Sequence, residues 1–149
     1  MTGNIEIFEA NLKDLGEIRR FEKECFGVDA WPLVDLIAML VFPGIVRLKA
    51  VADGLLVGVV AGDVRRSQNR AWIVTLGVRP EYRRKGIARM LLRECEKRLA
   101  ASTIRLSVRR SNLAAISLYE KEGYRQVDVW EKYYVDREDA LVLEKINDS

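Results

Sequence analysis

A basic segment that leads into a predicted helix is the part of the sequence best suited to bind phosphate. It runs Val78-Arg-Pro-Glu-Tyr-Arg-Arg-Lys-Gly-Ile-Ala-Arg89, leaves a hydrophobic run and turns at Pro80. A helix N-terminus presents unpaired backbone N–H groups and partial positive charge, which favour an anion. Gly86 and Ala88 are small enough for a pyrophosphate to approach the backbone. The side chains that add positive charge there are Arg83, Arg84, Lys85 and Arg89.

This spacing matches neither a Walker loop nor the dinucleotide G-x-G-x-x-G pattern. A solvated basic turn is the alternative interpretation of the segment. The net charge of +3 is mild, and phosphate-tracking proteins usually cluster their basic residues on one face, so no nucleic-acid partner is expected.

The composition excludes several kinds of catalysis, because the sequence contains no histidine. Ser-His-Asp and Cys-His nucleophiles, histidine-bearing zinc sites and a histidine general base are all ruled out. Cys25 and Cys95 lie far apart on apolar helical stripes, so we expect buried free thiols and no metal site.

The elements that must position this segment follow from the hydrophobic pattern. Asn11 is expected to cap a helix that ends near Gly27, and Asp53-Gly54 indicates a hairpin. The predicted order is β-α-α-β-β-β-α-β-α-β-β, an α/β (α+β) fold with a mixed, mostly antiparallel sheet flanked by about four helices. The expected strands are 5–8, 46–51, 55–61, 71–78, 103–108, 127–134 and 140–146, and the expected helices are 11–27, 32–40, 86–99 and 113–122, with a polar loop at 65–70.

No linker or repeat interrupts the pattern, so residues 1–149 are expected to form one domain. The longest uncharged stretch, Leu36 to Val46, is broken by Pro43 and is shorter than the ~18 apolar residues of a membrane span. The N-terminus lacks the basic and apolar regions of a signal peptide. These features favour a cytoplasmic protein without membrane association.

Three blocks of the sequence resemble the GNAT acetyltransferase superfamily. Arg83-x-x-Gly86-x-Ala88, after the strand Val74-Thr-Leu-Gly-Val78, is similar to its pyrophosphate-binding motif. The other blocks are Val108-Arg-Arg-Ser-Asn112 with the downstream Leu118-Tyr119 and Gly123-Tyr124, and Tyr133-Tyr134 with Arg137-Glu-Asp-Ala140. Together they resemble the RimI-type ribosomal-protein alanine and protein N-terminal acetyltransferases over nearly the whole chain.

The resemblance implies acetyl-CoA as co-substrate and a role for each matching residue. The pantetheine arm would pair with a splayed strand at Leu76, Gly77 and Val78. The pyrophosphate would rest on the N–H groups from Arg84 to Arg89, which include Ile87. Asn112 would meet the cofactor, or would simply cap the following helix.

The resemblance also implies a general acid and a peptide groove. Tyr119 matches the tyrosine that protonates the departing CoA thiolate, although it could be only an inner-face aromatic. Tyr133 and Tyr134, expected on a strand and on opposite sides of it, would hold the peptide backbone. Asp29 and Trp31 would form the other wall, or Trp31 would be a core anchor.

One position departs from the family pattern. RimI-type enzymes carry a glutamate general base in Leu-Glu-Val-Arg, but this sequence reads Leu106-Ser107-Val108-Arg109. A hydroxyl at Ser107 is a poor proton acceptor at neutral pH. The remaining candidates are Asp29, Glu24, a tyrosine, or water relayed by Ser107 and backbone carbonyls.

The pKa of the substrate amine decides how strong a base the enzyme needs to remove its proton. A peptide α-amine of pKa ~8 is neutral in roughly a tenth of molecules at pH 7, whereas a lysine of pKa ~10.4 is neutral in about one in 2,500. The leading hypothesis is therefore acetyl transfer to a protein N-terminus, a ribosomal protein being one candidate, by direct attack on the thioester. The alternatives are a small amine, such as a polyamine, amino acid or aminoglycoside, and a non-catalytic acyl-CoA-binding module. Monomer and homodimer both remain open.

Overall fold

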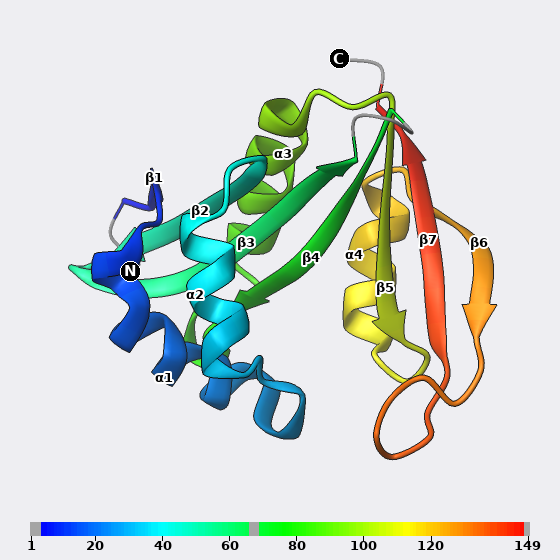
Figure 1. Cartoon of the computed structure of the whole chain (residues 1–149), viewed down its shortest axis with the longest axis horizontal. Coiled ribbons are helices and arrows are strands. Elements are labelled where there is room, and N and C mark those ends of the chain that lie inside the picture. The colour runs from blue at the N-terminus through cyan, green and yellow to red at the C-terminus, as the bar shows by residue number, and fades with distance from the viewer. Residues whose placement is uncertain (1–3, 66–68, 148–149) are drawn as a thin grey trace.

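The computed structural model describes residues 4–65 and 69–147, which form a mixed sheet with helices on both faces (Figure 1). The strand order is β1-β2-β3-β4-β5-β7-β6. Each neighbouring pair is antiparallel except β4 and β5, which are parallel. The strands are β1 (Glu6–Glu9), β2 (Ile45–Ala52), β3 (Leu55–Arg65), β4 (Arg70–Val78), β5 (Thr103–Arg109), β6 (Arg125–Trp130) and β7 (Ala140–Ile146). The predicted fold class and element order are confirmed, while residues 66–68 of the predicted polar loop lie outside the described part.

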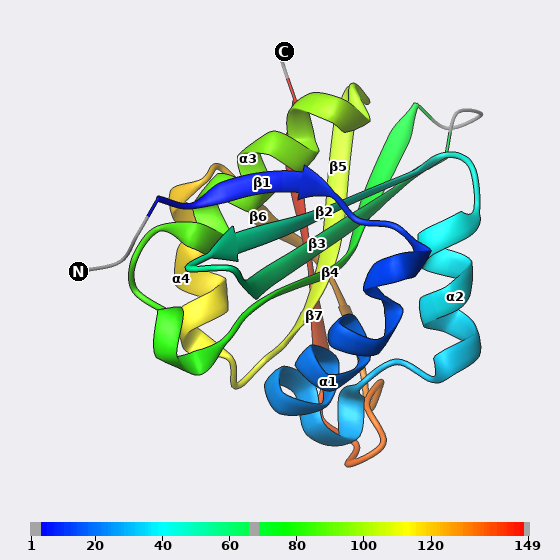
Figure 2. The ribbon, with the colours of Figure 1, turned by 90° about the vertical axis from the view of Figure 1, so that its left-hand side faces the viewer.

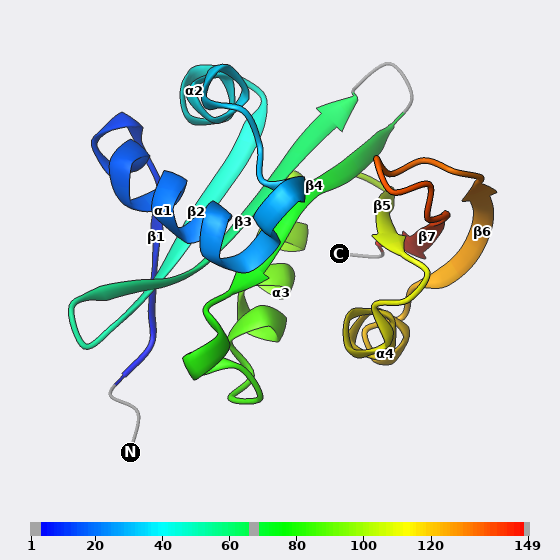
Figure 3. The same ribbon diagram turned by 90° about the horizontal axis from the view of Figure 1, so that it is seen from below.

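Four α-helices of the described chain cover the sheet in two pairs. They are α1 (Leu15–Phe26), α2 (Leu33–Val41), α3 (Ile87–Leu99) and α4 (Leu113–Lys121). Figures 2 and 3 show α1 and α2 on one face and α3 and α4 on the other. Each face has its own apolar core, built around Phe21 and Leu36 on the first and around Leu91 and Ile104 on the second. Among the described residues, no helix is long and apolar enough to cross a membrane.

The first helix begins later than its pattern predicts. The Asn11 side chain accepts a hydrogen bond from Lys13 N–H and caps a 3₁₀ turn, Leu12–Asp14, that precedes α1. The Asp14 carboxylate in turn accepts a hydrogen bond from the Asn11 N–H at 2.9 Å, and the two hydrogen bonds form a capping box. The capping prediction is confirmed, and the extra 3₁₀ turn is what the apolar spacing alone did not reveal.

Strands β4 and β5 touch at one end only. Their pairing is confined to Arg70–Trp72 opposite Thr103–Arg105, and beyond it the two strands diverge (Figure 1). On its other side β4 pairs with β3 as far as Val78. The C-terminal half of β4 therefore has a free edge facing the gap, as the resemblance implied.

A β-bulge interrupts β4 where the divergence begins. Ala61 of β3 lies opposite Thr75 while Gly62 lies opposite Ile73, so Val74 is the extra residue. Successive side chains of a regular strand point to opposite faces. Here Val74 packs with the core under α1 and α2, and the hydroxyl of the next residue, Thr75, also contacts α1. The bulge thus turns two consecutive side chains toward the same helices.

The predicted strand 127–134 is wrong at its C-terminal end, because β6 stops at Trp130. Lys132 adopts a positive φ of 51°, and its N–H donates to Asp139 Oδ1 at 3.0 Å. The chain therefore folds back toward β7 and the strand cannot continue. Tyr133 and Tyr134 lie in the β6–β7 loop, with their rings edge to face at 5.1 Å, and not on opposite sides of a strand.

Candidate active site

A groove of about 720 Å³ opens where β4 and β5 diverge. Its floor is formed by β4 and β5, one wall by the segment between α1 and α2, and the other by α4 and the β6–β7 loop. The predicted site residues that line it are Asp29, Trp31, Leu76, Ser107, Asn112, Tyr119, Tyr133 and Tyr134. Residues that the resemblance assigned from separate parts of the chain therefore meet at one groove.

The phosphate cradle lies at the N-terminus of α3. The first hydrogen bond of the helix runs from Met90 N–H to Gly86 C=O at 3.0 Å, so the amides just before it are available to a ligand. Gly86 has φ +83°, and a Cβ built on it would meet nothing within 4 Å. The requirement at Gly86 is thus conformational, and the space beside it is open to an anion.

The four basic side chains of this segment do not act alike. Arg83 folds back, and its Nε donates to the Val78 carbonyl at 3.0 Å. Arg89 pairs with Glu122 at 3.3 Å. Arg84 and Lys85 are exposed, and the Lys85 Nζ lies 6.0 Å from the centre of the Tyr82 ring. Arg84 and Lys85 are therefore the cations best placed to meet a bound phosphate, whereas Arg83 braces the turn.

The free edge of β4 fits an extended thioester arm. Leu76, Gly77 and Val78 pair with β3 on one side only. The Val78 carbonyl is already occupied, by Arg83 and by the thiol of Cys25 at 3.6 Å. The Gly77 carbonyl lies toward β3, 3.2 Å from the position of a Cβ on Gly58, so the backbone groups of Leu76 are the ones that face the gap. Together with the open cradle they form a path of the kind acetyl-CoA requires.

Tyr119 lies buried at the bottom of the groove, 8% exposed. Its ring packs edge to face on Tyr124, with the centroids 5.8 Å apart. Burial, reinforced by Tyr134, raises the pKa of the Tyr119 phenol well above its ordinary value. The phenol therefore keeps its proton at neutral pH, as a general acid must.

Asn112 and the two cysteines have clear structural roles. The Asn112 side chain accepts from Ala115 N–H at 3.2 Å and caps α4, while the residue also lines the groove. Both cysteines are free, as predicted, but only Cys95 is fully buried and Cys25 is partly exposed. Burial raises the pKa of the Cys95 thiol to about 12, which makes it a poor nucleophile at neutral pH.

Arg109 ties the two walls of the groove together. Its guanidinium binds both Asp29 oxygens, at 2.7 and 2.8 Å, and Glu138 at 2.7 Å. It also reaches Asp136 at 3.0 Å and lies over the Tyr134 ring, 4.1 Å from its centre. These contacts hold the pKa of Arg109 above its ordinary value, so the link is charged at every working pH.

Each of the two carboxylates proposed as the general base is paired with an arginine. Both oxygens of Asp29 are engaged by the guanidinium of Arg109, so neither is free to accept a proton from a bound amine. Glu24 pairs with Arg79, is half exposed and does not line the groove. Ser107 lines the groove beside Tyr134, and its hydroxyl opposes the rise that burial imposes on the pKa of that phenol.

The aromatic residues form the rim of the groove. Trp31 is 37% exposed and Tyr133 56%, so the alternative of Trp31 as a core anchor is wrong. Tyr133 also packs on Trp130, with their centroids 5.1 Å apart, and Trp130 stacks on Trp72 at 5.7 Å. The aromatic stack fixes the loop that the sequence pattern had extended into a strand.

Two residues of this groove, Arg109 and Thr75, and one residue behind it, Glu22, were not identified from the sequence. Arg109 was noted only as part of a motif, and its contacts depend on loops distant in sequence. The β4 bulge places Thr75 at the groove, and no local sequence pattern predicts that bulge. Glu22 did leave a signal, since it lies one helical turn after Ile18 on the apolar stripe of α1.

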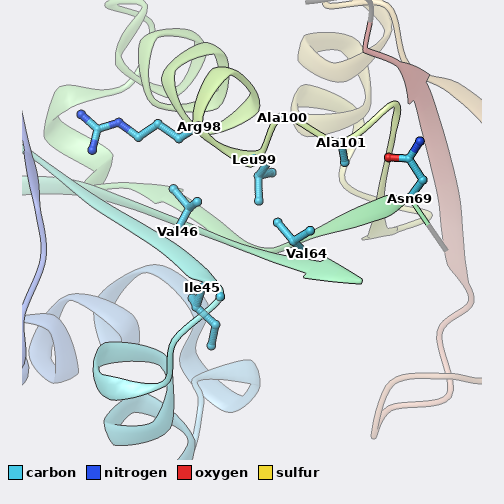
Figure 4. A pocket seen from close by; sticks show the side chains of 9 residues that line it. Ile45, Val46, Val64, Asn69, Arg98, Leu99, Ala100 and Ala101 are labelled. Carbon is cyan, nitrogen blue, oxygen red and sulfur yellow. The ribbon is translucent and has the colours of Figure 1, made fainter. Parts of the chain in front are cut away.

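A second hollow of about 550 Å³ lies at the other end of the sheet, between β2, β3 and the end of α3 (Figure 4). Its lining is mostly aliphatic, with Ile45, Val64 and Leu99 among its members. Its cation, Arg98, is held by Glu94 at 3.0 Å. Nothing in this lining resembles a catalytic group.

Comparison with known proteins identifies the family. The acetyltransferase (GNAT) family profile matches residues 15–124, and the N-alpha-acetyltransferase RimI of Mycobacterium tuberculosis is 33% identical over 80% of this chain and 77% of its own. This chain therefore belongs to the GNAT acetyltransferase family, as its motifs predicted.

Two further relatives show how much of this chain is similar to known acetyltransferases. The ribosomal-protein-S18-alanine N-acetyltransferase from Escherichia coli has a solved structure that superposes with a TM-score of 0.87 at 26% identity, covering 98% of this chain and 96% of that one. An N-alpha-acetyltransferase of Saccharolobus solfataricus is 45% identical over 48% of this chain and 45% of its own. In the first matches among curated relatives, the aligned part of this chain spans about half of their length.

Proposed function

We propose that this chain transfers the acetyl group of acetyl-CoA to the α-amine of a protein N-terminus. The observation that carries the proposal is the shared groove, in which a buried, protonated tyrosine lies between a free strand edge and an aromatic rim. The cradle and the free edge would hold the CoA thioester, and the rim would receive the end of a peptide. Relatives named as N-alpha-acetyltransferases and as a ribosomal protein bS18-alanine N-acetyltransferase support the same acceptor.

The chain's residues account for the steps of a direct transfer. The cradle amides and Arg84 would anchor the pyrophosphate, which fixes the thioester against β4. The neutral amine would attack the carbonyl carbon, and the C–S bond would break as the C–N bond forms. The Tyr119 phenol would give its proton to the CoA sulphur, and a proton lost from the amine nitrogen would restore it.

The charge distribution favours a peptide over a polyamine. A polyamine site needs free carboxylates, but Asp29 in the groove and Asp136 and Glu138 in the adjoining β6–β7 loop are all engaged by Arg109. The peptide would instead meet aromatic and backbone groups. A protein N-terminus also loses its proton far more readily than lysine does, as the pKa values of the two amines require.

One observation favours a second candidate, a non-catalytic acyl-CoA-binding module, because Ser107 stands where related enzymes carry a glutamate. CoA release should be measured with acetyl-CoA and a panel of N-terminal peptides, one beginning with Ala, with spermidine and α-blocked peptides as controls. Our proposal predicts turnover with free N-termini alone. Binding of acetyl-CoA without turnover on any amine would contradict it and support the second candidate.

A further inference from the structure

Glu22 is a buried carboxylate without a cationic partner. It is 1% exposed, and no ion pair among the described residues includes it. The other buried glutamates are neutralised: Glu96 by Lys145 at 2.9 Å and Glu122 by Arg93 at 2.7 Å. Burying an unpaired charge is costly unless the group can take up a proton. Among the buried acids, Glu22 is thus the one built to change its protonation state.

Both hydrogen bonds of Glu22 lead to the candidate active site. One oxygen accepts from the Trp31 backbone N–H at 3.3 Å, and the other from the Thr75 hydroxyl at 3.4 Å. Trp31 and Thr75 both line the groove. The carboxylate therefore lies one side chain away from the place where the amine would be bound, at the bulge of β4.

We propose that Glu22 is the final acceptor of the proton that the substrate amine must lose, with the Thr75 hydroxyl as the relay. The inference rests on the proposed function. The ammonium N–H donates its proton to Thr75 Oγ1 as the Thr75 hydroxyl proton passes to Glu22 Oε2. The amine is left with a free lone pair and Glu22 becomes neutral. After the amide product leaves, the proton returns by the same hydroxyl to water in the groove.

The surroundings of Glu22 suit a proton acceptor at neutral pH. Burial raises the pKa of its carboxyl, and the hydrogen bonds from Trp31 and Thr75 oppose this rise only in part. The thiol of Cys25 lies on the same helix and interacts electrostatically with Glu22. Burial raises the pKa of that thiol, so it stays neutral. Across the groove, Asp29 is paired with Arg109. This network supplies the base that is missing at Ser107.

The pH dependence of acetyl transfer tests the relay. With an N-terminal peptide, Glu22→Gln and Thr75→Val should each lower kcat/KM on the order of tenfold at pH 7, because only roughly a tenth of an amine of pKa ~8 is then neutral. The loss should shrink toward pH 9.5, where an amine of pKa ~8 is already neutral. Thr75→Ser keeps the hydroxyl and should stay within about threefold of the wild type.

Glu17→Gln is the matched control for these variants. Glu17 lies on the same helix, accepts from Leu56 N–H at 3.2 Å and does not line the groove. It should leave the rates unchanged, and all four variants should keep the acetyl-CoA dissociation constant of the wild type. A loss that is the same from pH 6.5 to 9.5, or below about threefold at pH 7, would overturn the relay while the proposed function stands. Absence of turnover by the wild type would overturn both.

Discussion

At the scale of single residues, the buried Glu22 carboxyl carries a cost in stability at neutral pH. Its pKa is raised in the fold by burial, so the native state binds its proton more tightly than the unfolded chain does. Stability therefore falls as the pH rises from the unfolded value of ~4.3 through the folded value. Above that window the ionised carboxylate is buried without a cation.

Replacing this carboxyl by an amide should reveal that cost. Glu22→Gln is expected to raise the melting temperature at pH 8 and to leave it nearly unchanged at pH 4, where the wild-type carboxyl is already protonated. Thermal unfolding of both proteins across this range measures the difference. A lower melting temperature for Glu22→Gln at pH 8 would show that the ionised carboxylate stabilises the fold.

Tyr119 offers a second test at this scale. Tyr119→Phe retains the ring contact with Tyr124 and removes the phenol that we propose protonates the CoA thiolate. We expect kcat to fall by roughly 10²–10⁴-fold, with the acetyl-CoA dissociation constant and the melting temperature little changed. Because burial raises the phenol pKa, no falling limb from Tyr119 should appear in the wild-type pH profile below pH 10. Unchanged turnover would remove Tyr119 from the mechanism.

At the scale of elements, the end of α1 presses against β4 where the thioester would lie. A Cβ on Gly77 would come within 2.7 Å of Phe26 Cζ. Gly77→Ala should destabilise the protein by about 1–3 kcal/mol and weaken acetyl-CoA binding, because the free edge of β4 must shift. Denaturant unfolding and calorimetric titration measure the two effects.

Gly16→Ala is the control for that substitution. Gly16 lies in α1, and a Cβ there would meet only the Arg20 side chain, at 3.9 Å. The alanine should stabilise the helix by about 0.5–1 kcal/mol and leave acetyl-CoA binding intact. Equal effects of the two substitutions would contradict the close approach of α1 to β4.

The elements also show which features of the fold could be predicted from the sequence. The Asp53-Gly54 hairpin, the helix that begins after Gly86 and the order of the elements along the chain could be predicted, because they depend on neighbours along the chain. The loop position of Tyr133 could not, since it depends on Trp130 stacking on Trp72 of another strand. Thr75 faces Glu22 only because the β4 bulge shifts the alternation of side chains. Contacts set by register and by distant loops are the ones that local patterns miss.

At the scale of the whole molecule, Arg109 joins the α1–α2 segment to the β6–β7 loop and so sets the width of the groove. Arg109→Gln should raise the KM for a peptide on the order of tenfold with a smaller change in kcat, because the walls lose their common anchor. Arg110→Gln is the control, since Arg110 is exposed, its guanidinium pairs with Asp139 at 3.3 Å, and it does not line the groove. If kcat fell and KM did not, Arg109 would act on the chemistry and not on the walls.

The most direct test of the central claim uses a peptide that has both a free α-amine and an internal lysine. The peptide is incubated with the protein and acetyl-CoA at pH 7, and the acetylated position is located by tandem mass spectrometry. The groove, the absence of a carboxylate at position 107 and the pKa values of the two amines predict acetylation at the α-amine. Acetyl groups on the lysine, with the α-amine left free, would contradict the account.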